Sequence, residues 1–282
     1  MTNLLKCGLI GSNISRTRMP MALDVMCRAK GMELDFSLID TEHDNALDFR
    51  TTVDKLRQDG WTGVTVTHPH KAEAATYAGG RMDREVAHLG ASNLLIFGPS
   101  LTGWNTDYLG FIAAWRAVFK NRSPGEVVVA GAGGVSRAIV PALLKLGARR
   151  IAVFDANHDA AVDLAKASGR RVQAVPLSDA PAAIAEATGL INATPLGMSG
   201  HPGTAFDPAL VSPQNWAFDA VYTPTDTEFL THAASKDLAI LTGFDLFRFM
   251  ALETFRIYTG HTPDRASILP QLDALRPRKT TA

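Results

Sequence analysis

The chain has 282 residues, of which 46% are apolar, and its 28 basic side chains are balanced by 28 acidic ones. This length exceeds what one hydrophobic core usually holds, so it favours two domains. The balanced charge gives no support to a nucleic acid or an anionic membrane as partner, and no apolar run is long enough to span a bilayer. We therefore expect a cytoplasmic protein without nucleic-acid or membrane partners.

Candidate metal ligands are sparse. Cys7 and Cys27 are the only cysteines, and their spacing fits neither a zinc site nor a disulfide framework. His68 and His70 flank Pro69, but no further ligands follow at suitable spacing. We expect no bound metal.

The first hundred residues alternate between predicted strands and helices, as is typical of an α/β domain. Strands are predicted at 7–11, 35–40, 63–67 and within 90–97, and helices at 20–30, 45–59 and from residue 71. Polar loops at 11–20, 65–71 and 103–107 follow the strands. In open α/β sheets ligands bind at the carboxyl ends of strands, so these loops are candidates for a ligand site.

Residues 126–155 form the most specific pattern in the chain. A β-branched run at 127–130 is followed by a glycine turn, a helical pattern at 136–146 and a second strand that ends on Asp155. Gly131 permits a sharp turn, and Gly133 lets a pyrophosphate approach the backbone. The helix that begins near Val135 directs its N–H groups at the phosphates. The alternative is a glycine-rich turn that binds no ligand.

Asp155 follows the glycine turn near the sequence separation, roughly 20 residues, at which a carboxylate accepts hydrogen bonds from a ribose 2′-OH. Its negative charge disfavours a 2′-phosphate. The pattern therefore predicts a Rossmann-type unit that binds NAD, with NADP as the second choice. The expected cofactor contacts here are Gly131, Ala132, Gly133, Gly134, Val135, Asp155 and Asn157.

Seven motifs together resemble the shikimate dehydrogenase family: GVTVTHPHK, GASN, GWNTDYLG, VVVAGAGGVSRA, INATPLGM, DAVYTPTDTEFL and GFDLFRFMALETFRIYTG. They span nearly the whole chain. The resemblance implies two α/β domains, an N-terminal substrate domain at 1–107 plus 246–282 and a Rossmann-type NAD(P)-binding domain at 108–245. It implies hydride transfer between NAD(P) and a cyclic hydroxy acid, as between dehydroshikimate and shikimate.

The resemblance places catalysis on Lys71 and Asp107. A lysine near the alcohol oxygen can stabilise a developing alkoxide and exchange its proton, and a carboxylate beside it can orient the ammonium. Taken singly, Lys71 also fits a solvated surface lysine. Asp107 also fits a helix N-cap, since an apolar periodic segment starts at Tyr108.

Further site residues follow from the same resemblance. Thr67 and Asn93 match positions that hydrogen-bond ring hydroxyls, and an amide can both donate and accept. Tyr222 matches a substrate-pocket tyrosine, although a packed strand-end tyrosine is an equal alternative. The expected contacts to the nicotinamide half are Thr194, Met198 and Gly243.

The sequence departs from the family in the substrate loop. Two family serines that bind the substrate carboxylate are replaced by Thr17 and Met19, and a family glutamine is replaced by Met250. Losing one hydrogen bond to a charged group weakens binding by roughly 1.5–3 kcal/mol. Arg16 and Arg18 are either a replacement carboxylate clamp or solvated loop arginines. After the second strand the family's common Asn-Arg-Thr is absent, which agrees with NAD.

We therefore expect an NAD-dependent dehydrogenase, as a monomer or homodimer, that acts on a shikimate-like ring acid. Quinate, aminoshikimate or another ring carboxylate are alternative substrates. A dinucleotide-binding regulator without turnover is the alternative from another class, and a methylenetetrahydrofolate-type dehydrogenase is a weaker one.

Overall fold

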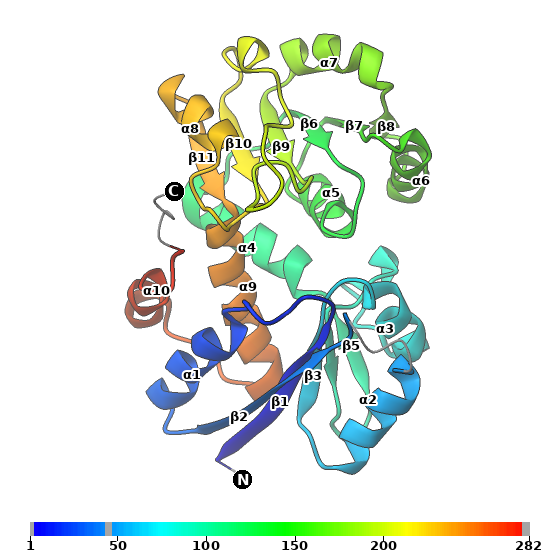
Figure 1. Cartoon of the computed structure of the whole chain (residues 1–282), viewed down its shortest axis with the longest axis vertical. Helices are drawn as coiled ribbons and strands as arrows, with labels where there is room; N and C mark the ends of the chain where they lie inside the picture. Colours follow the sequence, from blue (N-terminus) through cyan, green and yellow to red (C-terminus); the bar gives the residue numbers. More distant parts are fainter. Residues whose placement is uncertain (1–2, 43–46, 278–282) are drawn as a thin grey trace. The chain divides into compact units, whose positions relative to one another are not determined.

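A computed structural model describes residues 3–42 and 47–277, and the chain divides into two units (Figure 1). One unit contains residues 1–110 and 250–275, and the other contains residues 111–249 and 276–282. Of the predicted elements, the first two residues of the helix expected at 45–59 lie outside the described residues. Among the described residues, no helix is long and apolar enough to cross a membrane.

The first unit is built on a five-stranded mixed sheet of order β2-β1-β3-β4-β5. Its first three strands are parallel, and β4 runs antiparallel to both of its neighbours. The strands are β1 Leu4–Gly11, β2 Glu33–Asp40, β3 Gly63–Val66, β4 Leu94–Ile96 and β5 Thr102–Trp104. Because β4 runs in the opposite direction, its first residue lies at the same edge as the last residues of β3 and β5.

Helices cover both faces of this sheet (Figure 1). They are α1 Met19–Ala29, α2 Phe49–Gln58, α3 Lys71–Ala78, the last part of α9 Gly243–Thr259, and α10 Arg265–Asp273, with the short 3-10 turns η1 Gly79–Arg81 and η2 Ala87–Leu89. Phe49 and Val53 of α2 pack with Ile10, Val64 and Val66 of the sheet in one buried cluster. The helix α2 begins at Phe49 because Asp48 caps it, accepting a hydrogen bond from Thr51 N at 2.7 Å.

The second unit contains a six-stranded parallel sheet of order β11-β10-β9-β6-β7-β8. The strands are β6 Glu126–Ala130, β7 Arg150–Phe154, β8 Val172–Ala174, β9 Gly189–Asn192, β10 Trp216–Asp219 and β11 Ala239–Thr242. The chain builds outward from β6 in one direction and then returns to build from β9 in the other. This is the order of a Rossmann-type sheet, so the predicted fold class is confirmed.

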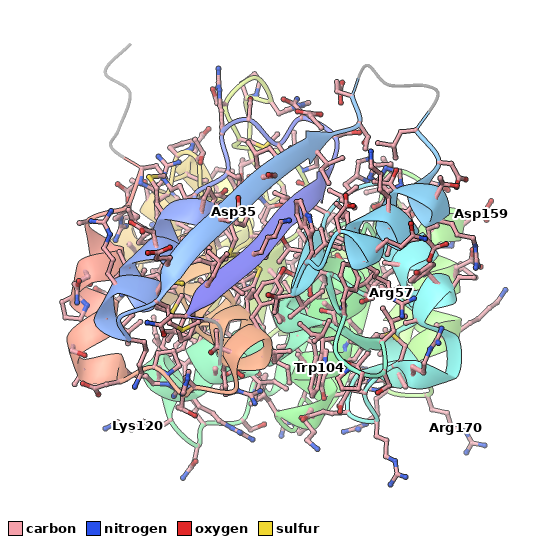
Figure 2. All side chains as sticks on the ribbon, turned by 90° about the horizontal axis from the view of Figure 1, so that it is seen from below. Asp35, Arg57, Trp104, Lys120, Asp159 and Arg170 are labelled. Atoms are coloured by element: carbon pink, nitrogen blue, oxygen red, sulfur yellow. The ribbon has the colours of Figure 1, made fainter. Side chains whose placement is uncertain are left out.

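The helices of this unit are the greater part of α4 Thr106–Phe119, α5 Ser136–Lys145, α6 His158–Ser168, α7 Ala180–Glu186, α8 Glu228–Ser235 and the first part of α9, with the 3-10 turns η3 Leu177–Asp179 and η4 Pro208–Leu210. The central strands β6, β9 and β10 are buried on both faces, and apart from Glu126, Asn192 and Asp219 at their ends they are apolar, as is typical of a parallel sheet. The charged side chains of Lys120, Asp159 and Arg170 lie on the outside (Figure 2).

Two fully buried tryptophans anchor the core of the second unit. The rings of Trp115 and Trp216 meet edge to face, with centroids 4.7 Å apart. The indole of Trp216 also lies over Gly189, where an added Cβ would be 1.9 Å from the ring. Only glycine fits there, because the Trp216 ring of β10 occupies the space beside its partner residue on β9.

Replacing Gly189 with Ala should therefore destabilise the protein, because the methyl group must displace a packed indole; such overpacking typically costs about 1–3 kcal/mol. Urea unfolding followed by tryptophan fluorescence measures the change. Gly80→Ala is the matched control, since nothing lies within 4 Å of its added Cβ. Equal stability of the two variants would contradict this packing.

Candidate functional site

Three loops of the first unit are joined at the edge where β1, β3 and β5 end. Ser12 N donates to His68 O at 2.8 Å, and Thr67 N donates to Ile10 O at 2.9 Å. Asn93, just before β4, donates its N–H to Trp104 O at 3.0 Å. The predicted residues Thr67, Lys71, Asn93 and Asp107 thus belong to one connected edge of the sheet.

Lys71 and Asp107 form a mostly buried ion pair. Lys71 Nζ donates to Asp107 Oδ2 at 2.6 Å, and the two side chains are 20% and 9% exposed. Lys71 is the first residue of α3, and Asp107 lies in the first turn of α4. At this burial each charge depends on the other, because removing one leaves the other desolvated and unpaired.

The alternative reading of Asp107 as a helix cap is wrong. Asn105 caps α4 instead, because its Oδ1 accepts from Tyr108 N at 3.1 Å while its Nδ2 donates to Ala91 O at 3.0 Å. The carboxylate of Asp107 is therefore left for Lys71. An asparagine directly before the helix was a signal in the sequence that the assignment to Asp107 overlooked.

The amide of Asn93 is held in one orientation. Its Oδ1 accepts from Thr106 N at 2.7 Å and from Thr106 Oγ1 at 3.2 Å. The hydroxyl of Thr254, on α9, in turn donates to Thr106 Oγ1 at 3.1 Å. Both lone pairs of the Asn93 oxygen are used, so this amide can only donate to a ligand, contrary to the expectation that it donates and accepts.

The substrate-loop residues take separate positions in the first unit. Thr17 is half-buried, and its Oγ1 accepts from Met19 N at 3.3 Å. Met19 starts α1 and is buried at 6% exposure. Arg18 donates through Nε to Leu275 O at 2.8 Å, whereas Arg16 is exposed.

Met250 lies where α4 and α9 pack closely within the same unit. An added Cβ at Gly110 would be 2.7 Å from the backbone of Met250, so the two helices approach there only because residue 110 is a glycine. The Met250 side chain is half-buried.

In the second unit the glycine turn forms an open cradle. Gly131 has φ +97° and lies against Ala193, and its N–H donates to Phe154 O at 2.8 Å. An added Cβ at Gly133 or Gly134 would meet nothing within 4 Å. No side chain caps the following helix α5, which begins beside Val135. The turn has the space and the N–H groups that a pyrophosphate needs.

Asp155 is tied to this cradle. Its Oδ2 accepts from Ala132 N at 2.7 Å, and its Oδ1 accepts from Asn157 N at 2.8 Å. The carboxylate therefore supports the turn as well as placing a negative charge at the end of β7. The sequence pattern predicts only a contact with the ribose for Asp155, and the support of the turn is additional.

The remaining predicted residues follow β9, β10 and β11. Thr194 is held by Asn192 Oδ1, and Met198 is 39% exposed. The Tyr222 ring stacks on Phe247 at 5.8 Å, which is a packing contact of the kind the alternative reading described.

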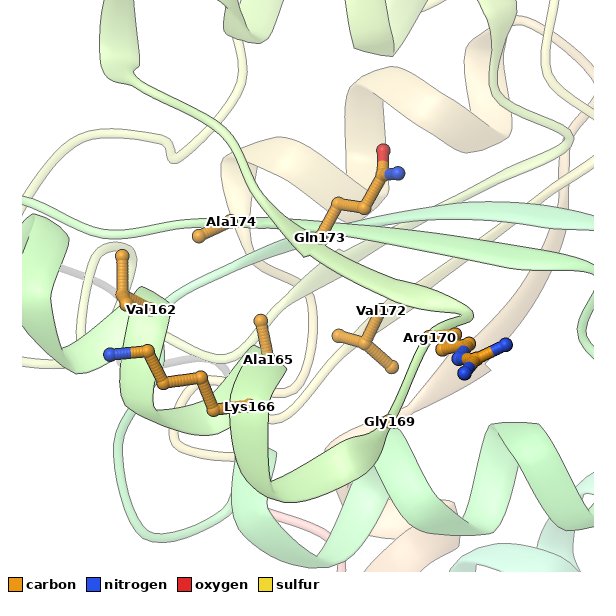
Figure 3. A pocket seen from close by; sticks show the side chains of 8 residues that line it. All are labelled: Val162, Ala165, Lys166, Gly169, Arg170, Val172, Gln173 and Ala174. Carbon is orange, nitrogen blue, oxygen red and sulfur yellow. The ribbon is translucent and has the colours of Figure 1, made fainter.

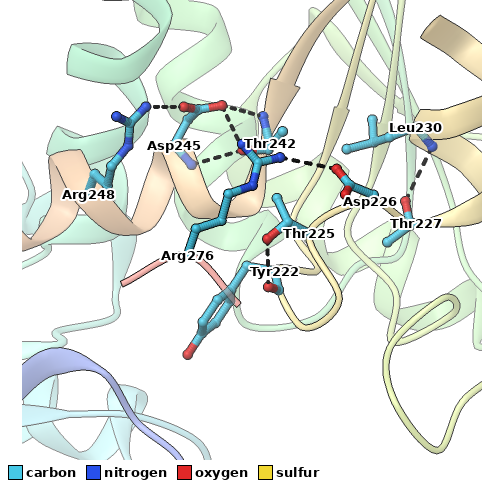
Figure 4. Close-up of polar contacts among 9 residues, drawn as sticks. All are labelled: Tyr222, Thr225, Asp226, Thr227, Leu230, Thr242, Asp245, Arg248 and Arg276. Atoms are coloured by element: carbon cyan, nitrogen blue, oxygen red, sulfur yellow. Dashed lines mark hydrogen bonds and ion pairs between the residues drawn. The ribbon is translucent and has the colours of Figure 1, made fainter. Parts of the chain in front are cut away.

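Gly243 starts α9 beneath the backbone of Ala220, where an added Cβ would be 2.5 Å from its carbonyl oxygen. Thr242 and Asp245 cap the same helix reciprocally, through Asp245 N to Thr242 Oγ1 and Thr242 N to Asp245 Oδ2 (Figure 4). The cap fixes where Gly243 lies.

Sequence reasoning missed a buried carboxylate, Asp219, at the end of β10. It accepts from Asn192 Nδ2, Val221 N and Thr227 Oγ1 at 3.0, 2.9 and 2.7 Å. Burial raises the pKa of Asp219 to about 6, and these three hydrogen bonds only partly oppose that rise.

The raised pKa of Asp219 gives a pH dependence of known sign. The folded state binds this proton more tightly than the unfolded state, so the contribution to stability increases as pH falls from about 6 toward the ordinary value of 3.8. Relative to Asp219→Asn, which cannot ionise, the wild type should gain roughly 1–3 kcal/mol in unfolding free energy between pH 8 and 4.5. Denaturant titrations across this range measure the difference, and a pH-independent difference would contradict the assignment.

One further depression of the surface holds no comparable set of catalytic side chains. An open depression between α6 and β8 is lined mainly by Val162, Ala165, Val172 and Ala174, with Lys166 and Arg170 at its rim (Figure 3). Within the described ranges, no three His, Cys, Asp or Glu side chains gather as a metal site would require.

Comparisons with known proteins agree with this arrangement. The model of the shikimate dehydrogenase substrate binding domain matches residues 9–95, and that of shikimate / quinate 5-dehydrogenase matches residues 115–197. The chain is 34% identical over 266 residues to the quinate/shikimate dehydrogenase (NAD(+)) of Corynebacterium efficiens, covering 91% of this chain and 93% of that one. It is 32% identical over 276 residues to the shikimate dehydrogenase (NADP(+)) of Streptomyces avermitilis, covering 95% and 94%.

Among solved structures, quinate dehydrogenase from Corynebacterium glutamicum in complex with NAD superposes with a TM-score of 0.89 at 32% identity, covering 97% of this chain and 99% of that one. A Thermus thermophilus shikimate 5-dehydrogenase in complex with NADP(H) and shikimate gives 0.78 at 28% identity, covering 96% and 99%. With two family models and relatives that align over nine-tenths of its length, this chain belongs to the shikimate dehydrogenase family.

Proposed function

We propose that this protein is an NAD-dependent dehydrogenase that interconverts the alcohol and ketone of a shikimate- or quinate-like ring acid. The observation that carries the proposal is the Lys71–Asp107 ion pair, 2.6 Å long, on the sheet edge that also presents Asn93. Relatives with this reaction in their names, including an NAD enzyme 34% identical to this chain, support it.

The residues divide the chemistry between them. When bound, the cofactor would accept the hydride in its oxidised form, NAD⁺, and supply it in its reduced form, NADH. Lys71 Nζ gives a proton to the ketone oxygen during reduction and takes it back during oxidation, while its charge stabilises the alkoxide that develops. Asp107 holds the ammonium in place and compensates its charge. Asn93 donates to a ring oxygen, and Thr67 offers a hydroxyl at the same edge.

The cradle at Gly133 and Gly134 fits NAD, because the space above it is open and the uncapped α5 begins there. Asp155 adds a carboxylate at the end of β7, suited to ribose hydroxyls and opposed to a 2′-phosphate. Substrate carboxylate binding is assigned to Thr17 with its neighbours in the loop after β1. A cytoplasmic location and a monomeric or homodimeric state remain predictions.

Replacing Lys71 with Ala should lower kcat by about 100- to 10,000-fold, the usual range for a lost general acid–base group. Binding of NAD should change little, because Lys71 belongs to the first unit and the glycine cradle to the second. Steady-state assays at the nicotinamide absorbance and NAD titrations measure the two quantities. Lys55→Ala, an exposed lysine of the same unit, is the control. Wild-type kcat in the Lys71 variant would refute its role.

Replacing Asp155 with Asn should move cofactor preference toward NADP. The amide keeps one acceptor for the loop but removes the negative charge, and relief of about 1.4 kcal/mol of repulsion corresponds to a tenfold change. The measurement is the ratio of kcat/KM for NADP to kcat/KM for NAD. The exposed Asp163→Asn supplies the control for general charge. An unchanged ratio would show that Asp155 does not select the cofactor.

Turnover of shikimate and quinate by the wild type separates the dehydrogenase from a non-catalytic dinucleotide-binding protein. Saturable NAD binding with no turnover of any ring acid would favour the latter.

A further inference from the structure

Asp219 lies fully buried at the carboxyl end of β10, which pairs with β9 and β11 in the parallel sheet. Its partners are an amide, a backbone N–H and a hydroxyl, all of them neutral. No Lys, Arg or His among the described residues forms an ion pair with Asp219. Burying an ionised carboxylate without a neighbouring cation costs folding free energy. We therefore expect the groups that hydrogen-bond to Asp219 to have a function that offsets this cost.

One arm of the network reaches the loop after β9. Asn192 donates through Nδ2 to Asp219 Oδ1 and to Leu196 O, at 3.0 and 2.9 Å. Its Oδ1 accepts from Thr194 N at 2.9 Å and from Thr194 Oγ1 at 2.7 Å. The side chain of Asn192 is therefore fully used, and Asp219 sets which way its amide faces.

The other arm reaches the segment after β10. Val221 N and Thr227 Oγ1 both donate to Asp219. Thr227 also accepts from Leu230 N at 3.2 Å, which caps α8, as Figure 4 shows. The segment between these two anchors carries Tyr222, so the same carboxylate fixes both of its ends.

We propose that Asp219 is a positioning residue that holds the loops after β9 and β10 in a single arrangement for the nicotinamide half of NAD. This rests on the proposed function, since NAD is the ligand that the arrangement serves. Asp219 does not touch the reacting atoms. It acts through Asn192, which orders residues 193–196, and through the two donors that bracket Tyr222.

The chemistry explains why a carboxylate is used. Three donors converge on one side chain, and a carboxylate accepts from all of them without a donor of its own. An asparagine keeps the two contacts at Oδ1 and turns an N–H toward Thr227, whose hydroxyl oxygen can accept it. An alanine leaves all three donors without a partner.

The test compares NAD dissociation constants, measured by titration, with thermal midpoints. Asp219→Ala should raise the Kd for NAD tenfold or more, and Asp219→Asn should restore it to within about threefold of the wild type. Asn192→Ala, which removes only the arm after β9, should also weaken NAD binding. The double variant should lose less than the sum of the two single losses, because the two changes share the arm through Asn192.

Gln214→Ala is the matched control. Gln214 is also buried, bonds Ile184 O and Leu210 O, and precedes the same strand at its other end. It should lower the thermal midpoint and leave the Kd for NAD unchanged. An Asp219→Ala protein that is destabilised like this control, yet binds NAD as the wild type does, would overturn the inference.

Measuring NAD binding by the wild type distinguishes failure of the proposed function from failure of the positioning role. Failure of the wild type to bind NAD refutes the proposed function itself, whereas normal binding by wild type and Asp219→Ala alike refutes only the positioning role. Should Asp219→Ala not fold, Thr227→Val removes one donor to the same carboxylate. It is expected to raise the Kd for NAD about threefold, and an unchanged Kd would count against the inference.

Discussion

Parallel strand pairing is the constraint on which the arrangement of both units depends. Neighbouring parallel strands deliver their carboxyl ends to one edge, so loops far apart in the sequence meet there. In the first unit β1 and β3 are paired in this way, and the antiparallel β4 brings its opposite end, with Asn93, to the same place. In the second unit all six strands obey the rule, and the glycine turn, Asn192 and Asp219 share one edge.

Each unit buries a carboxylate at that edge, and the two differ in how the charge is met. Asp107 faces the ammonium of Lys71, which is suited to proton exchange because both members remain partly exposed. Asp219 faces only neutral donors and is fully buried, which suits a fixed framework. Above the raised pKa of Asp219 its ionised carboxylate lowers the unfolding free energy of the protein. In return, its hydrogen bonds hold the loops after β9 and β10 in place.

Local patterns were enough to predict the Rossmann-type unit and the residues of the glycine turn, because its strand, turn, helix and acid are close in sequence. The pair Lys71 and Asp107 came from family motifs rather than from spacing. The sequence does contain Asn105 directly before helix α4, but the apolar pattern that starts at Tyr108 led to Asp107 as the expected cap. The bond from Thr254 to Thr106 joins residues 148 positions apart, and no local pattern announces it. Asp219 opens one of the family motifs, but its burial and its bond to Asn192, 27 positions away, could not be seen in a local pattern.

The Asn93 oxygen already accepts two hydrogen bonds from Thr106, so the side-chain amide has only N–H donors to offer a ligand. An oxygen substituent beside it satisfies the amide N–H, whereas an ammonium group there would meet donors only, and a missing substituent would leave a mostly buried N–H without a partner. Aminated ring acids such as aminoshikimate are thereby disfavoured if the amine falls at that position. If Asn93 contacts the ring as proposed, Thr106 and Thr254 act through its oxygen on which ring substituent is accepted.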